Sequence, residues 1–332
     1  MTLFKQREVL LAGLVLALIL LVGLRAPVFL SAASLGNLLT DATLLIMLAL
    51  TQMFVIITRG IDLSVASNLA LSGMMAALLA ASQPALPLVL VIGVAVVIGL
   101  ALGLLNGWMI GVLELPPIVV TLGTMSVYRG LVFVLSGGAW VSSHQMPANF
   151  VAFPLATLLG VTHLVWIAAA MVALSWFVAR HTRFGRDLYA IGNEPRSARL
   201  IGIPTRRRLL WTYGLSGAMA GLCGYLWVAR YAVAYTEIAY GFEFTVIAAC
   251  VIGGISIAGG TGTVWGALLG AMFLAVINNA LPIVKVSPFW QSALTGFVIL
   301  TAVLINARGD EKGSRQILPL HLMNPTDHRK AA

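Results

Sequence analysis

The chain has 332 residues, of which 60% are apolar and only 9% charged, and its mean hydropathy is +0.99. Since ordinary soluble domains carry about a quarter charged residues, this composition excludes a water-soluble fold and indicates a chain surrounded by lipid. The net charge of +9 points to membrane topology rather than to nucleic acid, because the placement of Lys and Arg matters more than their sum.

Apolar stretches of about 20 residues, the length that a spanning helix needs, recur along the chain. We predict an all-α polytopic membrane protein of about ten transmembrane helices. The range is eight to ten, because several stretches are short and residues 244–258 fit a re-entrant or broken segment equally well. The first stretch is interpreted as an uncleaved span, since Gly23 to Pro27 offers no small-x-small cleavage site. The expected spans are residues 9–24, 42–58, 64–81, 88–113, 117–135, 155–179, 209–229, 244–258, 264–281 and 289–306.

The basic residues follow the positive-inside rule if the N-terminus lies inside. The inner segments then hold sixteen of the twenty Lys and Arg. This predicts a cytoplasmic N-terminus over residues 1–8, a transmembrane domain over 9–306 with a cytoplasmic loop at 180–208, and a cytoplasmic tail over 307–332. The outer segments hold only Arg25, Arg230 and Lys285, and Arg129 falls inside a predicted helix.

The third expected span begins with unusual polar residues. Asp62 precedes it, and Ser64, Asn68 and Ser72 lie at i, i+4 and i+8 on one helical face. Such a stripe is costly in lipid, so we expect it to face other helices or a water-filled solute path. Asp62 is expected to cap the helix N-terminus, and Arg59 to anchor at the membrane interface.

Glycine recurs every four residues in two spans, which lets helix backbones approach closely. The two glycine ladders take equivalent places if the chain is two repeats of five helices. An odd number of helices per repeat inverts the halves in the membrane, so two inverted five-helix repeats are a hypothesis. The helix-packing glycines are Gly99, Gly103, Gly107 and Gly111 in the fourth span and Gly262, Gly266 and Gly270 at the ninth.

A second polar face lies in residues 116–130, where Thr121, Thr124 and Tyr128 align at i, i+3 and i+7. Hydroxyls and an aromatic ring are what a path for a sugar would use. They are equally what packed membrane helices use for hydrogen bonds between helices. The neighbouring Arg129 needs an anion or several carbonyl groups as partners if it is buried.

The loop at 180–208 is the longest hydrophilic stretch on the inner side. After a turn, residues 196–204 predict one short amphipathic helix that ends in glycine and proline. Its arginines suit either anionic lipid headgroups or a cytoplasmic partner. The residues assigned to this loop are Gly192, Asn193, Glu194, Arg196, Arg199 and Gly202.

Signals for catalysis are weak. Gly214 to Gly217 matches the Gly-x-Ser-Gly pattern of intramembrane serine proteases, but a nucleophilic serine needs a histidine within reach. His144 and His163 fall on the outer side, whereas Ser216 lies near the inner end of its helix. Cysteine and histidine show no metal-ligand spacing, and the sequence has no Gly-x-x-x-x-Gly-Lys-Ser/Thr loop. We expect no enzyme and no bound cofactor or metal, with ATP and magnesium handled by another subunit.

Four blocks of the sequence together resemble the ribose-type permeases of bacterial ATP-binding cassette importers. The resemblance runs in order from about residue 40 to 305. Within that family, Arg59 to Asn68 and Ser136 to Val141 look closest to the rhamnose-uptake and autoinducer-2 permeases. The blocks are Gly60-Ile61-Asp62-Leu63-Ser64-Val65, Pro116 to Gly130, Ala190-Ile191-Gly192-Asn193-Glu194 to Gly202-Ile203, and Ala248 to Ser256 with Gly259 to Gly262.

This resemblance implies a bacterial inner-membrane protein that pairs with a second copy or a homologous permease, with two cytoplasmic ATPase domains and with a periplasmic sugar-binding protein. It also implies that the Gly192 to Gly202 loop meets the ATPase and that the solute is a monosaccharide, best a deoxyhexose such as rhamnose. An ion-coupled secondary transporter is the main alternative, since glycine breaks and polar stripes serve it equally well. An intramembrane enzyme is the remote alternative.

Overall fold

The computed structural model describes residues 2–283, 290, 293 and 296–297. Most of the expected span 289–306 and the whole tail 307–332 lie outside these residues. In chain order the elements are α1 (Thr2–Arg25), η1 (Pro27–Leu30), α2 (Ala32–Ile57), α3 (Val65–Ser82), α4 (Leu88–Gly111), α5 (Pro117–Ser136), β1 (Val141–Ser142), η2 (Ser143–Gln145), α6 (Ala148–Ala152), η3 (Phe153–Leu155), β2 (Thr157–Leu158), β3 (Val161–Thr162), α7 (His163–His181), α8 (Arg183–Asn193), α9 (Pro195–Leu200), α10 (Thr205–Tyr231), β4 (Val233–Ala234), α11 (Phe242–Ile252) and α12 (Val264–Ile283).

Seven helices in the described part of the chain are long and apolar enough to cross a membrane: α1, α2, α3, α4, α5, α7 and α12. They coincide with the first six expected spans and the ninth. In α2, 94% of the apolar window is buried, whereas in α7 only 17% is buried. Helix α2 is therefore the centre of the bundle, and α7 presents apolar side chains outward, as lipid contact requires.

Helix α10 coincides with the expected span 209–229 and is the longest helix described, at 27 residues. Its first turns carry three arginines and its middle carries four glycines, which lower its mean hydropathy. Three of those glycines lie against α4, and the fourth, Gly224, lies against Leu69 and Gly73 of α3. A Cβ added at Gly99 would lie 2.3 Å from the carbonyl oxygen of Gly217, and one at Gly103 would lie 2.2 Å from that of Tyr213. Gly107 and Gly111 meet Leu210 and Arg206 of the same helix in the same way.

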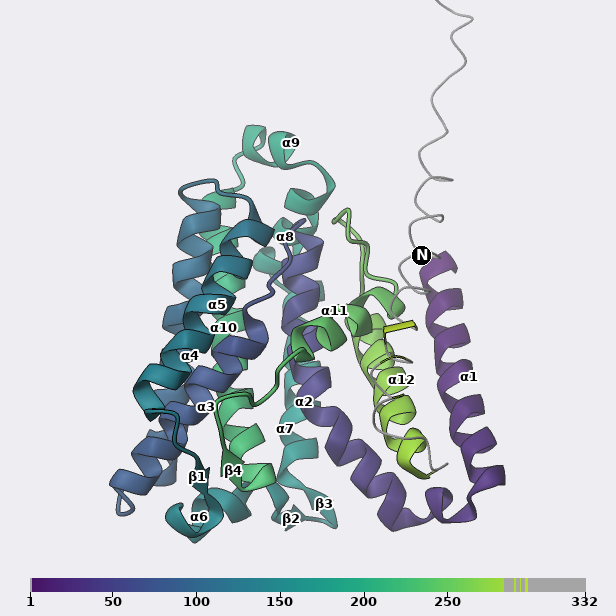
Figure 1. Ribbon diagram of the computed structural model, residues 1–332. Coiled ribbons are helices and arrows are strands. Elements are labelled where there is room, and N and C mark those ends of the chain that lie inside the picture. Colours follow the sequence, from purple (N-terminus) through teal and green to yellow (C-terminus); the bar gives the residue numbers. More distant parts are fainter. Residues whose placement is uncertain (1, 284–289, 291–292, 294–295, 298–332) are drawn as a thin grey trace, which may run out of the picture.

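Residues 233–263 cross the molecule as a broken segment. At one end, Ala234 of β4 pairs with Val141 of β1, and at the other end the backbone N–H of Gly260 donates to the carbonyl of Ile57 at 2.9 Å. Between them α11 has only 11 residues, about 17 Å of helix, and it ends at Gly253 and Gly254, the latter with φ of +81°. The expected span 244–258 is thus a short helix followed by a turn, within a segment that runs from one end of the bundle toward the other (Figure 1).

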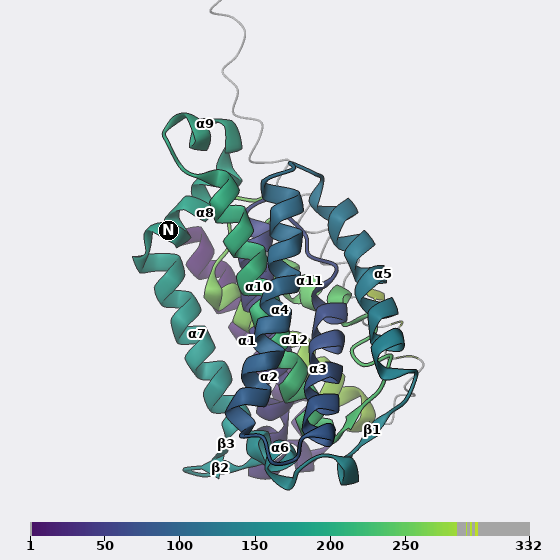
Figure 2. The same ribbon diagram turned by 90° about the vertical axis from the view of Figure 1, so that its left-hand side faces the viewer.

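The two ends of the bundle differ in character. Helices α8 and α9 project from one end, named here the basic end, toward which the first residues of α1 also lie (Figure 1). Helix α6 and the short strands lie at the opposite end, as the view turned by 90° also shows (Figure 2). Strand β2 pairs with β3 there as a small hairpin. The arginines of α8, α9 and the start of α10 therefore gather at one end of the molecule.

The second glycine ladder has a different neighbour from the first. A Cβ at Gly266 would lie 2.2 Å from the carbonyl oxygen of Gly253, and one at Gly270 would lie 2.0 Å from that of Ala249. Both contacts are with α11 and the turn that follows it, whereas the α4 ladder faces α10. Gly262 lies in the loop before α12, with φ of +156°. The two ladders thus do not face equivalent helices.

Candidate solute path and coupling loop

Asp62 lies in the segment between α2 and α3 and is almost fully buried. Its Oδ1 accepts hydrogen bonds from the backbone N–H and the hydroxyl of Ser64, at 2.9 and 2.7 Å, and its Oδ2 accepts one from Ser216 of α10 at 3.4 Å. The N-cap position of α3 is Ser64, so the expectation that Asp62 is the cap was wrong. Asp62 instead stabilises the turn that leads into the helix.

The polar face continues through α4 to α5. Asn106 Nδ2 donates to the Ser64 hydroxyl at 2.8 Å, and Asn106 Oδ1 accepts from the Tyr128 hydroxyl at 3.4 Å. The same hydroxyl donates to the carbonyl of Leu102 at 2.9 Å. One chain of hydrogen bonds therefore joins α10, the start of α3, α4 and α5.

The remaining residues of the two predicted stripes also bond within the protein. Asn68 Nδ2 donates to the carbonyl of Gly99 at 3.1 Å, and Asn68 Oδ1 accepts from Ser72 at 3.0 Å. The Thr121 hydroxyl reaches the carbonyl of Ile61 at 3.0 Å. Thr124 bonds to carbonyls of its own helix.

Six of the seven predicted path residues are thus brought together: Asp62, Ser64, Asn68, Thr121, Thr124 and Tyr128. All six are buried, and neither of the two main cavities is lined by them. Buried polar groups that bond across helix interfaces hold membrane helices together. In this conformation five of the six side chains bond to other segments of the bundle, and Thr124 bonds within α5.

Arg129 lies apart from this network. Its Nη1 donates to the carbonyl of Ile238 at 2.7 Å, and its guanidinium lies 5.6 Å from the centre of the Tyr240 ring. Glu243 and Glu237 are close enough to interact with its charge. Arg129 therefore links α5 to the segment between β4 and α11, where its partners are the Ile238 carbonyl and the Tyr240 ring.

The predicted loop forms two helices at the basic end. Gly192 and Asn193 end α8, Glu194 caps α9 by accepting from the backbone N–H of Arg196 at 3.2 Å, and Gly202 follows with φ of +84°. The tip of α9 is apolar and uncovered, since Leu200 is 87% exposed and Ile201 75%. Arg196 is exposed, and Arg199 forms a half-exposed ion pair with Glu114 at 3.5 Å, which contributes little to stability.

The base of this loop is held tightly against the bundle. Arg59, which we expect at the membrane interface, donates from its Nε and Nη2 to the carbonyls of Gly192 and Asn193 at 2.7 and 2.6 Å. A Cβ at Gly192 would lie 1.8 Å from the carbonyl oxygen of Ile57 and 2.5 Å from the backbone nitrogen of Gly260. The end of α8, the end of α2 and the loop before α12 therefore meet at one point, named here the junction.

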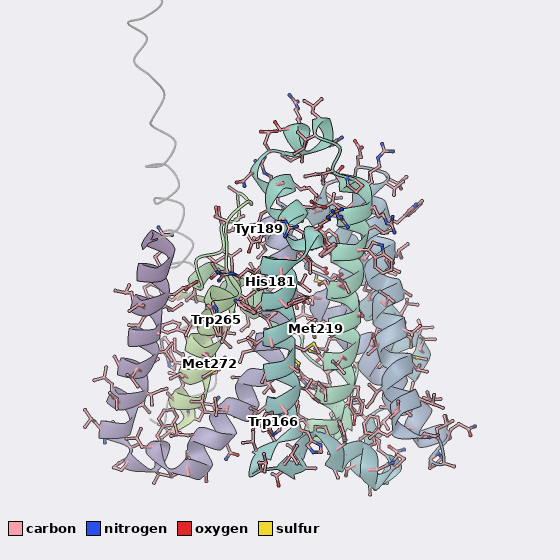
Figure 3. All side chains as sticks on the ribbon, turned by 180° about the vertical axis from the view of Figure 1, so that it is seen from behind. Trp166, His181, Tyr189, Met219, Trp265 and Met272 are labelled. Carbon is pink, nitrogen blue, oxygen red and sulfur yellow. The ribbon has the colours of Figure 1, made fainter. Side chains whose placement is uncertain are left out.

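Tyr189 adds a further contact between α8 and the loop before α12 (Figure 3). Its hydroxyl donates to the carbonyl of Gly262 at 2.9 Å. Burial raises the pKa of Tyr189 to about 12, so the hydroxyl keeps its proton and remains a donor at physiological pH. Displacement of α8 would therefore pull on α2 and on the start of α12 together.

Two cavities differ in polarity. One, of about 240 Å3, is lined almost entirely by apolar side chains between α2, α7 and α10, where Met219 lies (Figure 3). The other, of about 650 Å3, is lined by charged, amide, aromatic and aliphatic side chains, mostly of α2, α10 and α12. The second alone has the chemistry of a site for a polar solute.

Two polar residues of the network were missed from the sequence. Asn106 lies between Gly103 and Gly107, and a buried amide inside a glycine ladder was the available signal. Ser216 was considered only as a nucleophile; it donates to Asp62, while His181 packs with Trp176 and Phe177. The contact between Ser216 and Asp62 joins residues that are 154 positions apart in the sequence, so no local sequence pattern indicates it.

Comparison with known proteins gives a consistent set of relatives. A family model described as the permease component of the branched-chain amino acid transport system matches residues 34–303. The chain is 34% identical to the autoinducer 2 import system permease protein LsrC of Escherichia coli O157:H7 over 305 residues, 92% of this chain and 88% of that protein. For LsrC of Shigella flexneri the identity is 33% with the same coverage, and for LsrC of Salmonella typhi it is 31%, over 92% and 86%. No solved structure matches the chain.

Proposed function

Because the chain belongs to the family of permease components of branched-chain amino acid transport systems, we propose that it is the membrane-spanning subunit of an ATP-binding cassette importer for a monosaccharide. The chain is a multi-pass membrane protein and a transport component, not an enzyme. The observation that carries the proposal beyond the family is the apolar tip of α9, exposed at the basic end above the junction. Such a tip suits a groove of a cytoplasmic ATPase.

The proposed partners are a second copy of this chain or a homologous permease, two cytoplasmic ATPase domains that bind ATP and magnesium, and a periplasmic sugar-binding protein. In this proposal the protein lies in the bacterial inner membrane and its basic end faces the cytoplasm, where the α9 arginines also lie near lipid headgroups. ATP-driven closure of the ATPases would move α9, and the junction would pass that motion to α2 and α12.

A ten-crossing topology with cytoplasmic termini remains part of this proposal, with the tenth crossing at 289–306. The packing of two central helices supports two inverted repeats, because each of them packs on two helices of the other half of the chain. Helix α10 packs on α3 and α4, and α2 packs on α11 and α12. Helices α2 and α10 also run in opposite directions (Figure 1). The short α11, which ends at Gly253 and Gly254, would then correspond to the interrupted helices of many transporters.

The solute is proposed from two directions. The sequence blocks favour a deoxyhexose such as rhamnose, whereas the relatives are named for the import of autoinducer 2. Uptake of labelled L-rhamnose and of autoinducer 2 by cells that express the complete transporter separates these solutes. Preference for either one decides the substrate, and uptake of neither would remove both assignments.

The mechanism is tested in vesicles that contain the permease with its ATPase and binding protein. We expect uptake to require ATP on the side of the membrane where the ATPase subunits lie. Uptake should persist when a protonophore dissipates the proton gradient. Uptake that follows the proton gradient without ATP would instead establish an ion-coupled secondary transporter.

The docking assignment is tested in the same vesicles with a double variant, Arg196→Glu with Arg199→Glu. Reversal of both charges at the α9 surface should lower uptake and solute-stimulated ATP hydrolysis while membrane insertion persists. Arg25→Glu, an exposed reversal at the opposite end, is the matched control and should leave both rates unchanged. Wild-type rates in the double variant would show that α9 is not the docking surface.

A further inference from the structure

The polar cavity lies at the end of the molecule opposite to α9. Its lining comes from the first turns of α2, the last turn of α10, the start of α11 and the last turns of α12. The ends of α2, α10 and α12 lie on the side of the strands and α6, and α11 lies nearer the middle of the bundle (Figure 1). At about 650 Å3, the cavity falls within the range of roughly 300–1,000 Å3 that small-molecule sites occupy.

One wall of the cavity is charged but neutral overall. Arg230 of α10 pairs with Asp41 of α2, and the Arg230 side chain is only 13% exposed. Its Nη1 is buried and finds no hydrogen-bond partner among the described residues. A buried guanidinium N–H that lacks a partner carries a desolvation cost, and the Arg230 side chain also lines the cavity.

Amide groups extend this wall toward the rim. Asn37 of α2 and Asn278 of α12 line the cavity and are exposed. Each amide offers both a donor and an acceptor, which is the pairing that a hydroxyl group needs. The amides carry no charge, so together with the Arg230–Asp41 pair they favour a neutral solute over an ion.

The other wall is aromatic. Trp227 packs on Tyr231 with ring centres 5.3 Å apart, and on the edge of Phe242 at 5.1 Å. The Arg230 guanidinium lies 5.5 Å from the centre of the Tyr231 ring, which holds the charge beside the aromatic wall. Rings offer a flat apolar surface to the C–H face of a cyclic polyol.

An ion pair and several amides cannot face hydrocarbon without a large cost, so this cavity opens to water or to another polar surface. We propose that it is a binding site for a small, neutral, polyhydroxylated solute of monosaccharide size. Arg230 and the amides bond the hydroxyls, and Trp227 and Tyr231 cover the C–H face. The proposal rests on the proposed function: the solute would enter here from the outer side, before it reaches the closed Asp62 network.

The site is tested by the reaction of an introduced cysteine, Asn278→Cys, with a membrane-impermeant maleimide added to the outside of intact cells. Both native cysteines are fully buried, so the unmodified chain serves as the blank. The probes are L-rhamnose, D-ribose, D-xylose and autoinducer 2. We expect labelling from outside, slowed by at least one probe by about threefold at twice its dissociation constant.

Leu158→Cys, on the exposed hairpin at the same end, is the matched control, and its labelling should not change with any probe. An Asn278→Cys chain that does not react from outside, or that reacts equally with and without all four probes, would overturn the site. Asn278→Ala should also raise KM for uptake several-fold with little change in kcat. An absence of ATP-driven uptake in wild-type cells would refute the proposed function. Protection of Asn278→Cys by a probe shows whether the cavity binds a solute, independently of the uptake result.

Discussion

Asn106 is the side chain through which α3, α4 and α5 share their polar contacts. It is fully buried and bonds Ser64 on one side and Tyr128 on the other. The sequence predicted both of these partners as polar positions, Ser64 on the stripe of the third span and Tyr128 on the stripe of the fifth, from their helical spacing. It could not show that an amide on a third helix completes the set, since that requires the packing of α4.

Replacement of Asn106 by leucine should destabilise the protein, because the Ser64 and Tyr128 hydroxyls would each lose a buried partner. We expect a loss of about 1–3 kcal/mol, measured as a lower Tm of the purified protein in detergent. Ser126→Ala, on the exposed face of α5 with a 3.4 Å bond to its own helix, is the control and should keep the wild-type Tm. An unchanged Tm for Asn106→Leu would show that the network contributes nothing to stability.

At the scale of elements, the close approach of α4 to α10 shapes the first half of the bundle. The glycine ladder predicted a tight contact, and the structure identifies the backbone of α10 as its neighbour. The α12 ladder predicted a contact in the same way but meets α11. A spacing of four residues thus marks a helix face that accepts a close neighbour without naming the neighbour.

Gly103→Ala should disturb this contact, because the added Cβ would lie 2.2 Å from the carbonyl oxygen of Tyr213. Backbone atoms of two helices must then move apart, at a cost of about 1–3 kcal/mol. Gly93→Ala in the same helix is the matched control, since a Cβ there meets nothing within 4 Å and alanine favours helix. The two Tm values should move in opposite directions, and equal shifts would contradict the packing account.

Arg59 tests the junction between α8 and the bundle. Arg59→Ala removes both bonds to the α8 carbonyls, so motion of α9 should reach α2 less effectively. We expect ATP hydrolysis to continue while the ratio of solute imported to ATP hydrolysed falls several-fold. Arg207→Ala, an exposed arginine at the same end, should leave the ratio unchanged. A normal ratio for Arg59→Ala would mean that coupling does not pass through this contact.

On the scale of the whole molecule, the segments that the arginine distribution assigns to one side of the membrane also lie at one end of the structure. The loop at 180–208 forms α8, α9 and the start of α10 at one end, and the outer segments form α6 and the short strands at the other (Figures 1 and 2). The positive-inside rule predicts that the basic end of this axis faces the cytoplasm.

Cysteine accessibility in intact cells checks that orientation. Leu159→Cys lies at the tip of the β2–β3 hairpin, where the side chain is 85% exposed, and Ser197→Cys lies on the exposed surface of α9. An impermeant thiol reagent should label the first in intact cells and the second only after the membrane is permeabilised. The reverse pattern would invert the topology and exclude α9 as a cytoplasmic docking site.

The sequence by itself determined the membrane class, most span positions, the polar stripes and a short helix in the basic loop, because hydropathy, helical spacing and charge placement are local properties. Only the tertiary structure decided that residues 233–263 cross as a broken segment, that Arg59 binds the end of α8, and that Asp62 meets Ser216. These features depend on contacts between residues far apart in the chain. The polar cavity is of the same kind: Asp41, Trp227, Arg230 and Asn278 line one cavity only when the ends of α2, α10 and α12 pack together.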